Sequence, residues 1–89
     1  MNEAEFRARA IASGFADFQH KEYSSDTDVP MHAHAFSVTL LVMDGEFSLQ
    51  YADSKSTFLP GECCDLPATV LHAERAGPSG ARVLLAKKI

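Results

Sequence analysis

The turn signals that follow Phe15 constrain the fold most strongly. Short apolar or alternating runs are separated there by turn residues at intervals of about eight to twelve positions. Within one such run, Phe47, Leu49 and Tyr51 alternate with polar residues, which is typical of a half-buried strand. No long run of helical periodicity lies between these segments. The pattern therefore predicts an all-β domain rather than a parallel α/β sheet.

The spacing of the turn residues predicts seven or eight strands. We expect them near residues 18–23, 29–34, 36–43, 46–52, 56–59, 62–66, 69–75 and 81–87. Asp44-Gly45 indicates a hairpin, and the segment 77–80, Gly-Pro-Ser-Gly, indicates a last tight turn. This number of short strands favours a jelly-roll barrel, whose closure would protect strand edges in so short a chain.

The N-terminal residues predict one short helix over residues 3–12. Asn2 is placed as N-cap, Glu5 as its capping-box partner, and Gly14 as the residue that ends the helix. We expect this segment, residues 1–14, to cover one side of a barrel formed by residues 15–89, or to contact a partner subunit.

Length, charge and composition limit the class of protein. Eighty-nine residues provide one domain, and the net charge of -4 disfavours binding to nucleic acid. No apolar run reaches the roughly 20 residues of a membrane helix, and the acidic N-terminus has no signal-peptide core. We expect a cytoplasmic protein with reduced cysteines. Hydrolase-elbow, phosphate-loop and dinucleotide motifs are missing from the sequence.

Three of the four histidines are spaced as a strand-based metal site requires. His32 and His34 are two positions apart and would share one face of a strand, while His72 would come from a distant strand. Three imidazoles leave coordination positions open for water or substrate. The alternative is three unrelated surface or core histidines. His20 has no partner at ligand spacing, and we expect it at the surface.

Around these histidines the chain resembles the cupin family over residues 26–88. The first cupin motif, G-x5-H-x-H-x3,4-E-x6-G, is matched by His32, His34 and Gly45, and the second, G-x5-P-x-G-x2-H-x3-N, by Gly61, Pro67 and His72. The resemblance implies a single-domain cupin-type jelly-roll β-barrel with a short N-terminal helix. It also implies a metal held by His32, His34 and His72, and a homodimer as in other small cupins.

Four positions depart from the cupin motifs. Asp26 replaces the leading glycine, Val38 the ligand glutamate, Thr69 the second-motif glycine, and Ala76 the final asparagine. Strand parity continued from the histidines puts Val38 on the inward face, with Phe36, Leu40 and Val42. The neutral three-histidine shell is similar to that of cupin dioxygenases, and also to degenerate cupins that only hold a metal or ligand.

Glu74 and the adjacent cysteines are the other candidate site residues. Glu74 shares a strand face with His72, so it could accept the second N–H of a ligating histidine, act as a general base, or replace the missing carboxylate ligand. The alternative is an ion pair with Arg75 or Lys87. Cys63 and Cys64 would point to opposite faces, with Cys64 in the core and Cys63 exposed or lining a pocket.

Three functions remain open from the sequence. The first is a metal-binding barrel that binds a small molecule without turnover, using iron, nickel, zinc, manganese or copper. The second is a metal-dependent enzyme of the oxygenase or isomerase class, in which Glu74 is catalytic and moves a proton. The third is a metal-free sensor or structural barrel. A mostly apolar inward face favours binding over catalysis.

Overall fold

The computed structural model describes residues 1–89 and contains one helix and six strands. In chain order these are α1 (Glu3–Ala12), β1 (Ala16–Tyr23), β2 (Asp28–His32), β3 (Ser37–Gln50), β4 (Lys55–Phe58), β5 (Cys63–Leu66) and β6 (His72–Lys88). All strand pairs are antiparallel. The predicted all-β jelly-roll fold with a short N-terminal helix is confirmed. The division into residues 1–14 and 15–89 stays a prediction.

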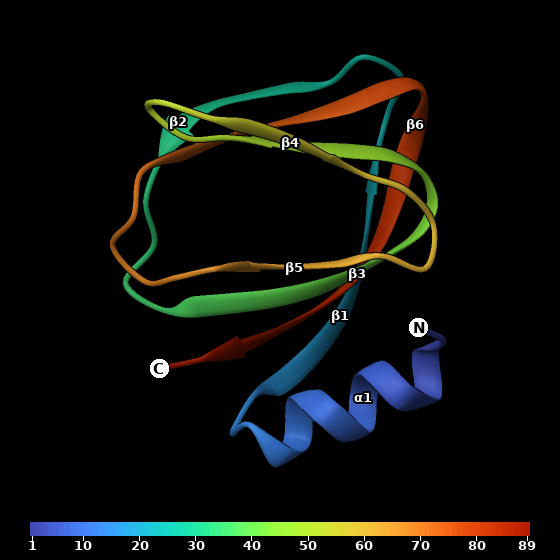
Figure 1. The fold of residues 1–89 in the computed structure, drawn as a ribbon, viewed down its shortest axis with the longest axis vertical. Coiled ribbons are helices and arrows are strands. Elements are labelled where there is room, and N and C mark those ends of the chain that lie inside the picture. Colours follow the sequence, from blue (N-terminus) through green and yellow to red (C-terminus); the bar gives the residue numbers. More distant parts are fainter.

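Two long strands, β3 and β6, pair with each other and belong to both layers of the molecule (Figure 1). In the lower layer of the figure, the first half of β3 pairs with β5 and the second half of β6 pairs with β1. In the upper layer, the second half of β3 pairs with β4 and the first half of β6 pairs with β2. The remaining four strands therefore all depend on this central pair.

The predicted hairpin at Asp44-Gly45 and the predicted tight turn at residues 77–80 are both wrong. Each segment lies inside a long strand, so the count of seven or eight strands becomes six. The two segments face each other, because Gly45 pairs with Ala81 and Phe47 with Ala76 across a register shift. Left-handed backbone at Gly45 and Gly80, both with φ +78°, bends the strands there without reversing them.

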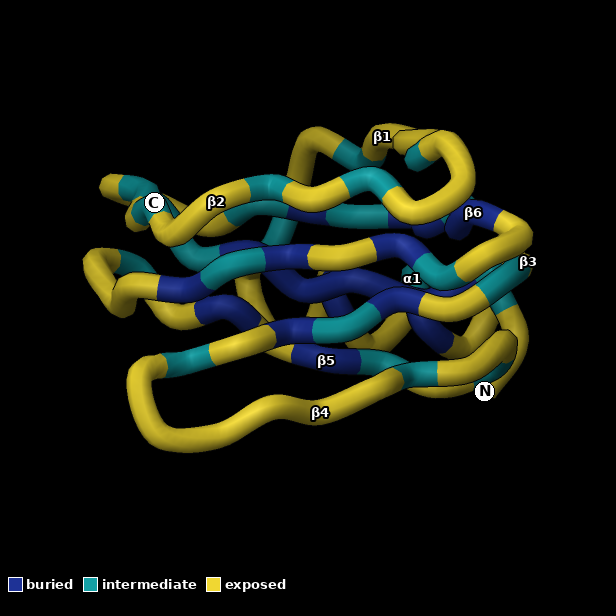
Figure 2. The backbone as a smooth tube through the Cα atoms, turned by 90° about the horizontal axis from the view of Figure 1, so that it is seen from above, coloured by how far each residue is buried: buried dark blue, intermediate teal, exposed yellow.

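The core lies between the two layers. Val38, Leu40 and Val42 of β3 are buried there, as strand parity predicts, together with Phe47 and Leu49. Four further aromatic residues pack against this cluster while partly exposed: Tyr23, Phe36, Tyr51 and Phe58. Figure 2 shows the buried stretches along β3, β5 and β6, whereas most of β4 is exposed. The buried face accounts for the alternation seen in the sequence.

Helix α1 covers the outside of the lower layer (Figure 1). Its predicted capping box is present: Asn2 Oδ1 accepts from the Glu5 N–H at 2.8 Å, and Glu5 Oε1 accepts from the Asn2 N–H at 3.1 Å. Phe6 is buried against Leu41 of β3 and Leu84 of β6, outside the main core. No helix is both long and apolar enough to cross a membrane.

Replacing Gly45 with alanine should test the shared bend. A Cβ atom at Gly45 would lie 2.1 Å from the carbonyl oxygen of Gly80, which is backbone and cannot rotate away. Gly61 has a similar φ of +89°, but there the nearest atoms lie 3.8 Å away. We expect Gly61→Ala to cost about 1 kcal/mol of unfolding free energy from backbone strain alone, and Gly45→Ala clearly more. Urea denaturation measures the unfolding free energy of both variants. An equal loss in the two variants would contradict the close approach of Gly45 to Gly80 at the shared bend.

Candidate metal centre

The structure brings His32, His34 and His72 together. His32 is the last residue of β2 and pairs with His72, the first residue of β6. His34 lies beyond the end of β2, so the expectation that both motif histidines share one strand is wrong. Its ring centroid nevertheless lies 4.7 Å from that of His32 and 5.1 Å from that of His72. One ligand nitrogen from each ring lies within 4.8 Å of the others.

Two loops that contact each other hold these rings in place. The segment before β6 donates the Thr69 N–H to the carbonyl oxygen of His34 at 2.7 Å, and the Ala68 N–H to Ser37 Oγ at 3.1 Å. The predicted strand at residues 69–75 therefore begins only at His72. Because the loops are joined by hydrogen bonds, His34 is fixed beside His72 although no strand carries it.

Backbone carbonyls orient two of the imidazoles. Nδ1 of His32 lies 2.7 Å from the carbonyl oxygen of Pro30, and Nδ1 of His72 lies 3.0 Å from that of Val70. A carbonyl oxygen only accepts, so each Nδ1 is the protonated nitrogen and each Nε2 of a neutral ring carries a lone pair. Metal-binding histidines are commonly oriented in this way. For His32 and His72, backbone carbonyls rather than Glu74 lie beside Nδ1. A role of Glu74 as acceptor from a ligating histidine stays a prediction.

Glu74 extends toward the two Nε2 atoms. Its carboxylate is 8% exposed, and Oε2 lies 3.1 Å from Nε2 of His32 and 3.5 Å from Nε2 of His72. The other oxygen, Oε1, accepts a hydrogen bond of 2.8 Å from the Tyr23 hydroxyl on β1. The alternative ion pair with Arg75 or Lys87 is wrong, because Arg75 instead pairs with Asp28 at 2.8 Å.

These contacts bring imidazole nitrogens and a carboxylate oxygen, all of which can donate an electron pair, together around the buried His72 side chain. Nε2 of His72 has no hydrogen-bond partner, and the side chain is 1% exposed. An unpartnered polar atom in the interior costs roughly 1–3 kcal/mol. Lone pairs on Glu74 Oε2 and on Nε2 of His32 and His72 repel each other at these distances. A proton or a metal ion between them removes this repulsion. The cluster of three imidazole nitrogens, with the Glu74 carboxylate beside two of them, is compatible with a divalent transition metal.

Burial also favours the ligating form of His34. Its pKa is lowered, first because burial disfavours the imidazolium, and then because of the positive charges that His32 and His72 can carry. The ring stacks on Phe36 with centroids 4.9 Å apart. A neutral imidazole is the form that binds metal.

A cavity of about 190 Å³ opens beside these side chains, between the two layers. We call it the inter-sheet cavity. Its apolar wall includes Val38 and Leu40, with Leu66 and Leu85 beside them, so Val38 does face the site as strand parity predicts. Tyr23 also lines it. Burial and the neighbouring Glu74 charge raise the pKa of Tyr23, so its hydroxyl stays a donor.

Solved structures share this architecture. No family model matches the sequence, and a search of curated proteins finds no match. A cupin-2 domain protein from Shewanella frigidimarina is 20% identical, with 81% of this chain and 69% of that chain covered and a TM-score of 0.71. A cupin superfamily protein from Desulfitobacterium hafniense is 21% identical, with coverages of 81% and 65% and a TM-score of 0.72. The protein has the cupin fold.

A third cupin-fold comparison matches over more of its own length. KdgF from Halomonas sp. is 17% identical, with 84% of this chain and 87% of that chain covered and a TM-score of 0.64. At these identities the similarity concerns the fold alone. The chemistry of the site must therefore be argued from the residues of this chain.

Two of the four departures from the cupin motifs adopt a backbone conformation that favours glycine. Asp26 and Thr69 both stand where the motifs have glycine, and both have positive φ, +56° and +68°. Aspartate tolerates this region, whereas a β-branched threonine rarely enters it. The Thr69 hydroxyl donates to the carbonyl oxygen of Ala68 at 2.6 Å. The loop before His72 thus keeps a glycine-type conformation at a cost in backbone strain.

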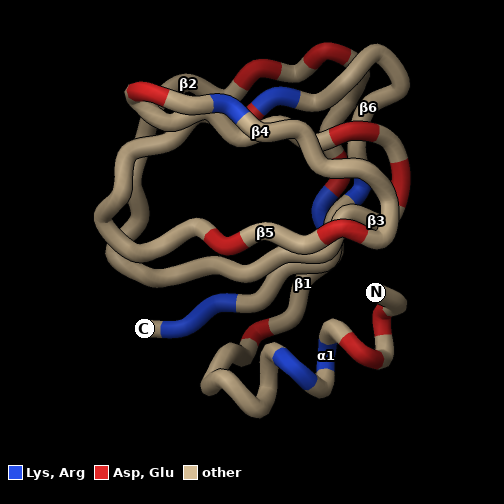
Figure 3. The backbone as a smooth tube through the Cα atoms, viewed as in Figure 1, with Lys and Arg blue, Asp and Glu red and all other residues tan.

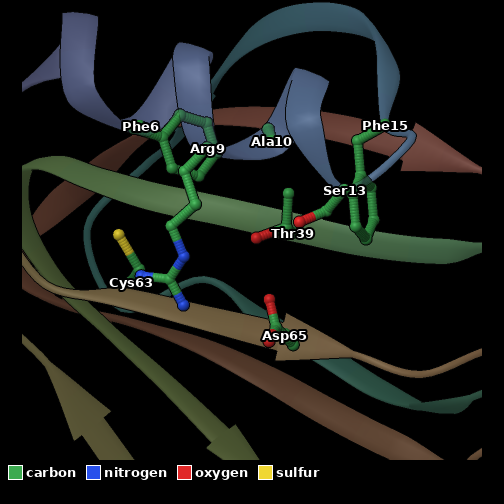
Figure 4. Close-up of a pocket in the computed structure, with 8 residues that line it drawn as sticks. All are labelled: Phe6, Arg9, Ala10, Ser13, Phe15, Thr39, Cys63 and Asp65. Carbon is green, nitrogen blue, oxygen red and sulfur yellow. The ribbon is translucent and has the colours of Figure 1, made fainter.

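The two cysteines lie on opposite faces of β5, as predicted, and are unpaired. Cys64 belongs to the core, and burial, followed by the charges of Asp65 and Cys63, raises its pKa to about 12. Cys63 lines a separate cavity of about 70 Å³ beneath α1, where the Arg9 guanidinium extends toward Cys63 and Asp65 (Figure 4). Burial raises the pKa of Cys63 as well, against the opposing effect of Arg9.

Alkylation should distinguish these two thiols. At pH 8 a thiol with a pKa of about 12 is ionised in about one molecule in ten thousand, so iodoacetamide should modify Cys63 well before Cys64. Mass spectrometry after timed quenching measures both rates, and the denatured protein, in which they should be similar, is the control. Faster reaction at Cys64 would contradict its burial.

The double variant Cys63→Ser/Cys64→Ala should keep its metal stoichiometry, because neither cysteine belongs to the histidine cluster or lines the inter-sheet cavity. Elemental analysis of the folded variant checks this. Loss of metal from it would require thiolate ligation.

Substitution Val38→Glu should place a second carboxylate in the inter-sheet cavity. Without metal, an additional buried charge near Glu74 should destabilise the fold by about 2 kcal/mol or more. With metal bound, the extra oxygen ligand should tighten binding and restore the melting temperature. Calorimetric titration and melting curves with and without zinc test both effects, with Val38→Gln as the uncharged control. Unchanged zinc affinity in a folded Val38→Glu protein would contradict the placement of Val38.

Proposed function

We propose that this cupin-fold protein binds one divalent transition metal through His32, His34 and His72 and uses that metal to hold a small molecule. The observation that carries the proposal is the unpartnered Nε2 of His72, which is buried among other ligand atoms. Both strand-borne histidines already have the orienting Nδ1 contacts that metal ligands use. The inter-sheet cavity beside them supplies space for the ligand.

Glu74 supports the same proposal from β6. Its Oε2 is the carboxylate oxygen nearest the imidazoles, and the bond from Tyr23 leaves that oxygen free to face them. Imidazole ligands suit iron, nickel, zinc and copper, and the added carboxylate makes manganese compatible as well. When bound, such an ion supplies a Lewis-acid centre for an oxygen-bearing ligand.

A metal-dependent enzyme of the oxygenase or isomerase class is the alternative. The specific observation in its favour is the Tyr23–Glu74 hydrogen bond, which puts a proton donor and a proton acceptor together at the wall of the inter-sheet cavity. Against it, the wall on the β3 side is apolar, with Val38 and Leu40, and Tyr23–Glu74 is the one donor–acceptor pair with a hydrogen bond at the cavity. Binding without turnover therefore remains the preferred function. The predictions of a homodimer and of a cytoplasmic location stay predictions.

Alanine substitutions test the three-histidine site. We expect His32→Ala, His34→Ala and His72→Ala each to lower zinc or cobalt affinity at least about tenfold, because each removes one of three nitrogen ligands. His20→Ala is the matched control, since His20 is exposed on β1 and outside the cavity. Calorimetry gives the affinities, and circular dichroism confirms the β-rich fold. Full metal occupancy in folded His72→Ala would contradict the three-histidine site. If the unaltered protein binds neither zinc nor cobalt, the metal-free sensor or structural barrel is favoured instead.

A further inference from the structure

The β1 side of the inter-sheet cavity is polar, although the sequence predicted a mostly apolar interior. Gln19, Lys21 and Tyr23 occupy alternate positions of β1 and all line the cavity. Across the sheet, Lys87 lines it two positions after Leu85 on β6. Strand alternation therefore directs two lysine side chains toward the same space as the histidines.

Neither of these lysines has a carboxylate partner. Arg7, Arg75 and Arg82 all form ion pairs with acidic residues, whereas Lys21 and Lys87 form none. Glu74 is the only acidic residue that lines the cavity, and it is already engaged by Tyr23 and His32. Figure 3 shows a basic segment at the C-terminal end of β6, with further basic and acidic segments spread over the rest of the chain. In a chain of net charge -4, the cavity wall thus has an unneutralised positive charge.

The lysines lie one aromatic ring away from the candidate metal centre. Lys21 Nζ is 4.9 Å from the centroid of the Tyr23 ring, whose hydroxyl binds Glu74. Lys87 Nζ is 4.9 Å from the centroid of Phe36, which stacks on His34. A ring face holds an ammonium group weakly and leaves its N–H donors available to an anion. The same cavity therefore presents cations on one side and metal ligands on the other.

We propose that the inter-sheet cavity is selective for a small carboxylate. The carboxylate group is held by Lys21 and Lys87, with the Gln19 amide beside them, and a second oxygen of the ligand faces the histidines. That second contact rests on the proposed metal-binding function, whereas the lysine contact does not. The volume of about 190 Å³ is below the 300–1,000 Å³ typical of sites for drug-sized ligands. The ligand is accordingly a carboxylate of a few carbon atoms.

Matched charged and neutral probes test this proposal. Acetate, malonate and succinate are titrated into the cobalt-loaded protein, with acetamide, malonamide and succinamide as neutral counterparts. Binding is measured by calorimetry and by change in the visible cobalt spectrum. We expect at least one carboxylate to bind at least about tenfold more tightly than its amide, with an affinity that falls as salt is added.

Lysine-to-methionine variants locate the interaction, because methionine keeps a long apolar side chain and removes the charge. Lys21→Met and Lys87→Met should each weaken carboxylate binding about fivefold, and the double variant should abolish the preference over the amide. Cobalt affinity should not fall in these variants. Lys55→Met is the control, since Lys55 lies on β4 outside the cavity, and it should bind the carboxylate as the unaltered protein does.

The outcomes separate this proposal from the metal-binding function. If no carboxylate binds better than its amide, or if the double variant binds as the unaltered protein does, the lysine site is wrong while cobalt binding can stand. The same titrations on metal-free protein show whether the lysines bind a carboxylate when no metal is present. If the histidines bind no cobalt but a lysine-dependent carboxylate preference persists, the metal-binding function fails and the anion site stands.

Discussion

The antiparallel pairing of β3 with β6 is the interaction on which the rest of the structure depends. β1 and β2 hydrogen-bond to β6, and β4 and β5 to β3, so no other strand is held without one of these two. Both strands bend together where Gly45 faces Ala81, which lets one pair serve two layers. The candidate site also depends on this pair. β6 supplies His72 and Glu74, and it pairs with β2, which supplies His32.

The site is organised by the backbone more than by its own side chains. Carbonyl oxygens of Pro30 and Val70 fix the two strand-borne imidazoles, and the loop hydrogen bond to His34 fixes the third ring. These contacts hold lone pairs in place that nothing in the protein neutralises. A cation that satisfies them is bound only by the folded chain, so metal binding and fold stability should be linked.

Features that arise from local pattern are predictable from the sequence, whereas features that depend on distant neighbours are not. The inward position of Val38 and the two cysteine faces could be inferred from strand alternation. The proximity of His32, His34 and His72 followed from their spacing in the cupin motifs, although His34 lies beyond the end of β2. The bend at Asp44-Gly45 could not, because a glycine with positive φ serves a hairpin and a bulge equally. The role of Tyr23 also escaped prediction, since 51 positions separate it from Glu74. The unpaired state of Lys21 and Lys87 likewise depends on which acidic residues the fold brings near.

The central place of β6, the last strand of the chain, has a consequence for biosynthesis. During translation β1 and β2 leave the ribosome long before the strand that completes their hydrogen bonding, and His32 is made well before its partner His72. At about 5–20 residues per second, the first strands would wait several seconds with open edges. A metal held by all three histidines could therefore bind only after His72 and its pairing with β2 are in place.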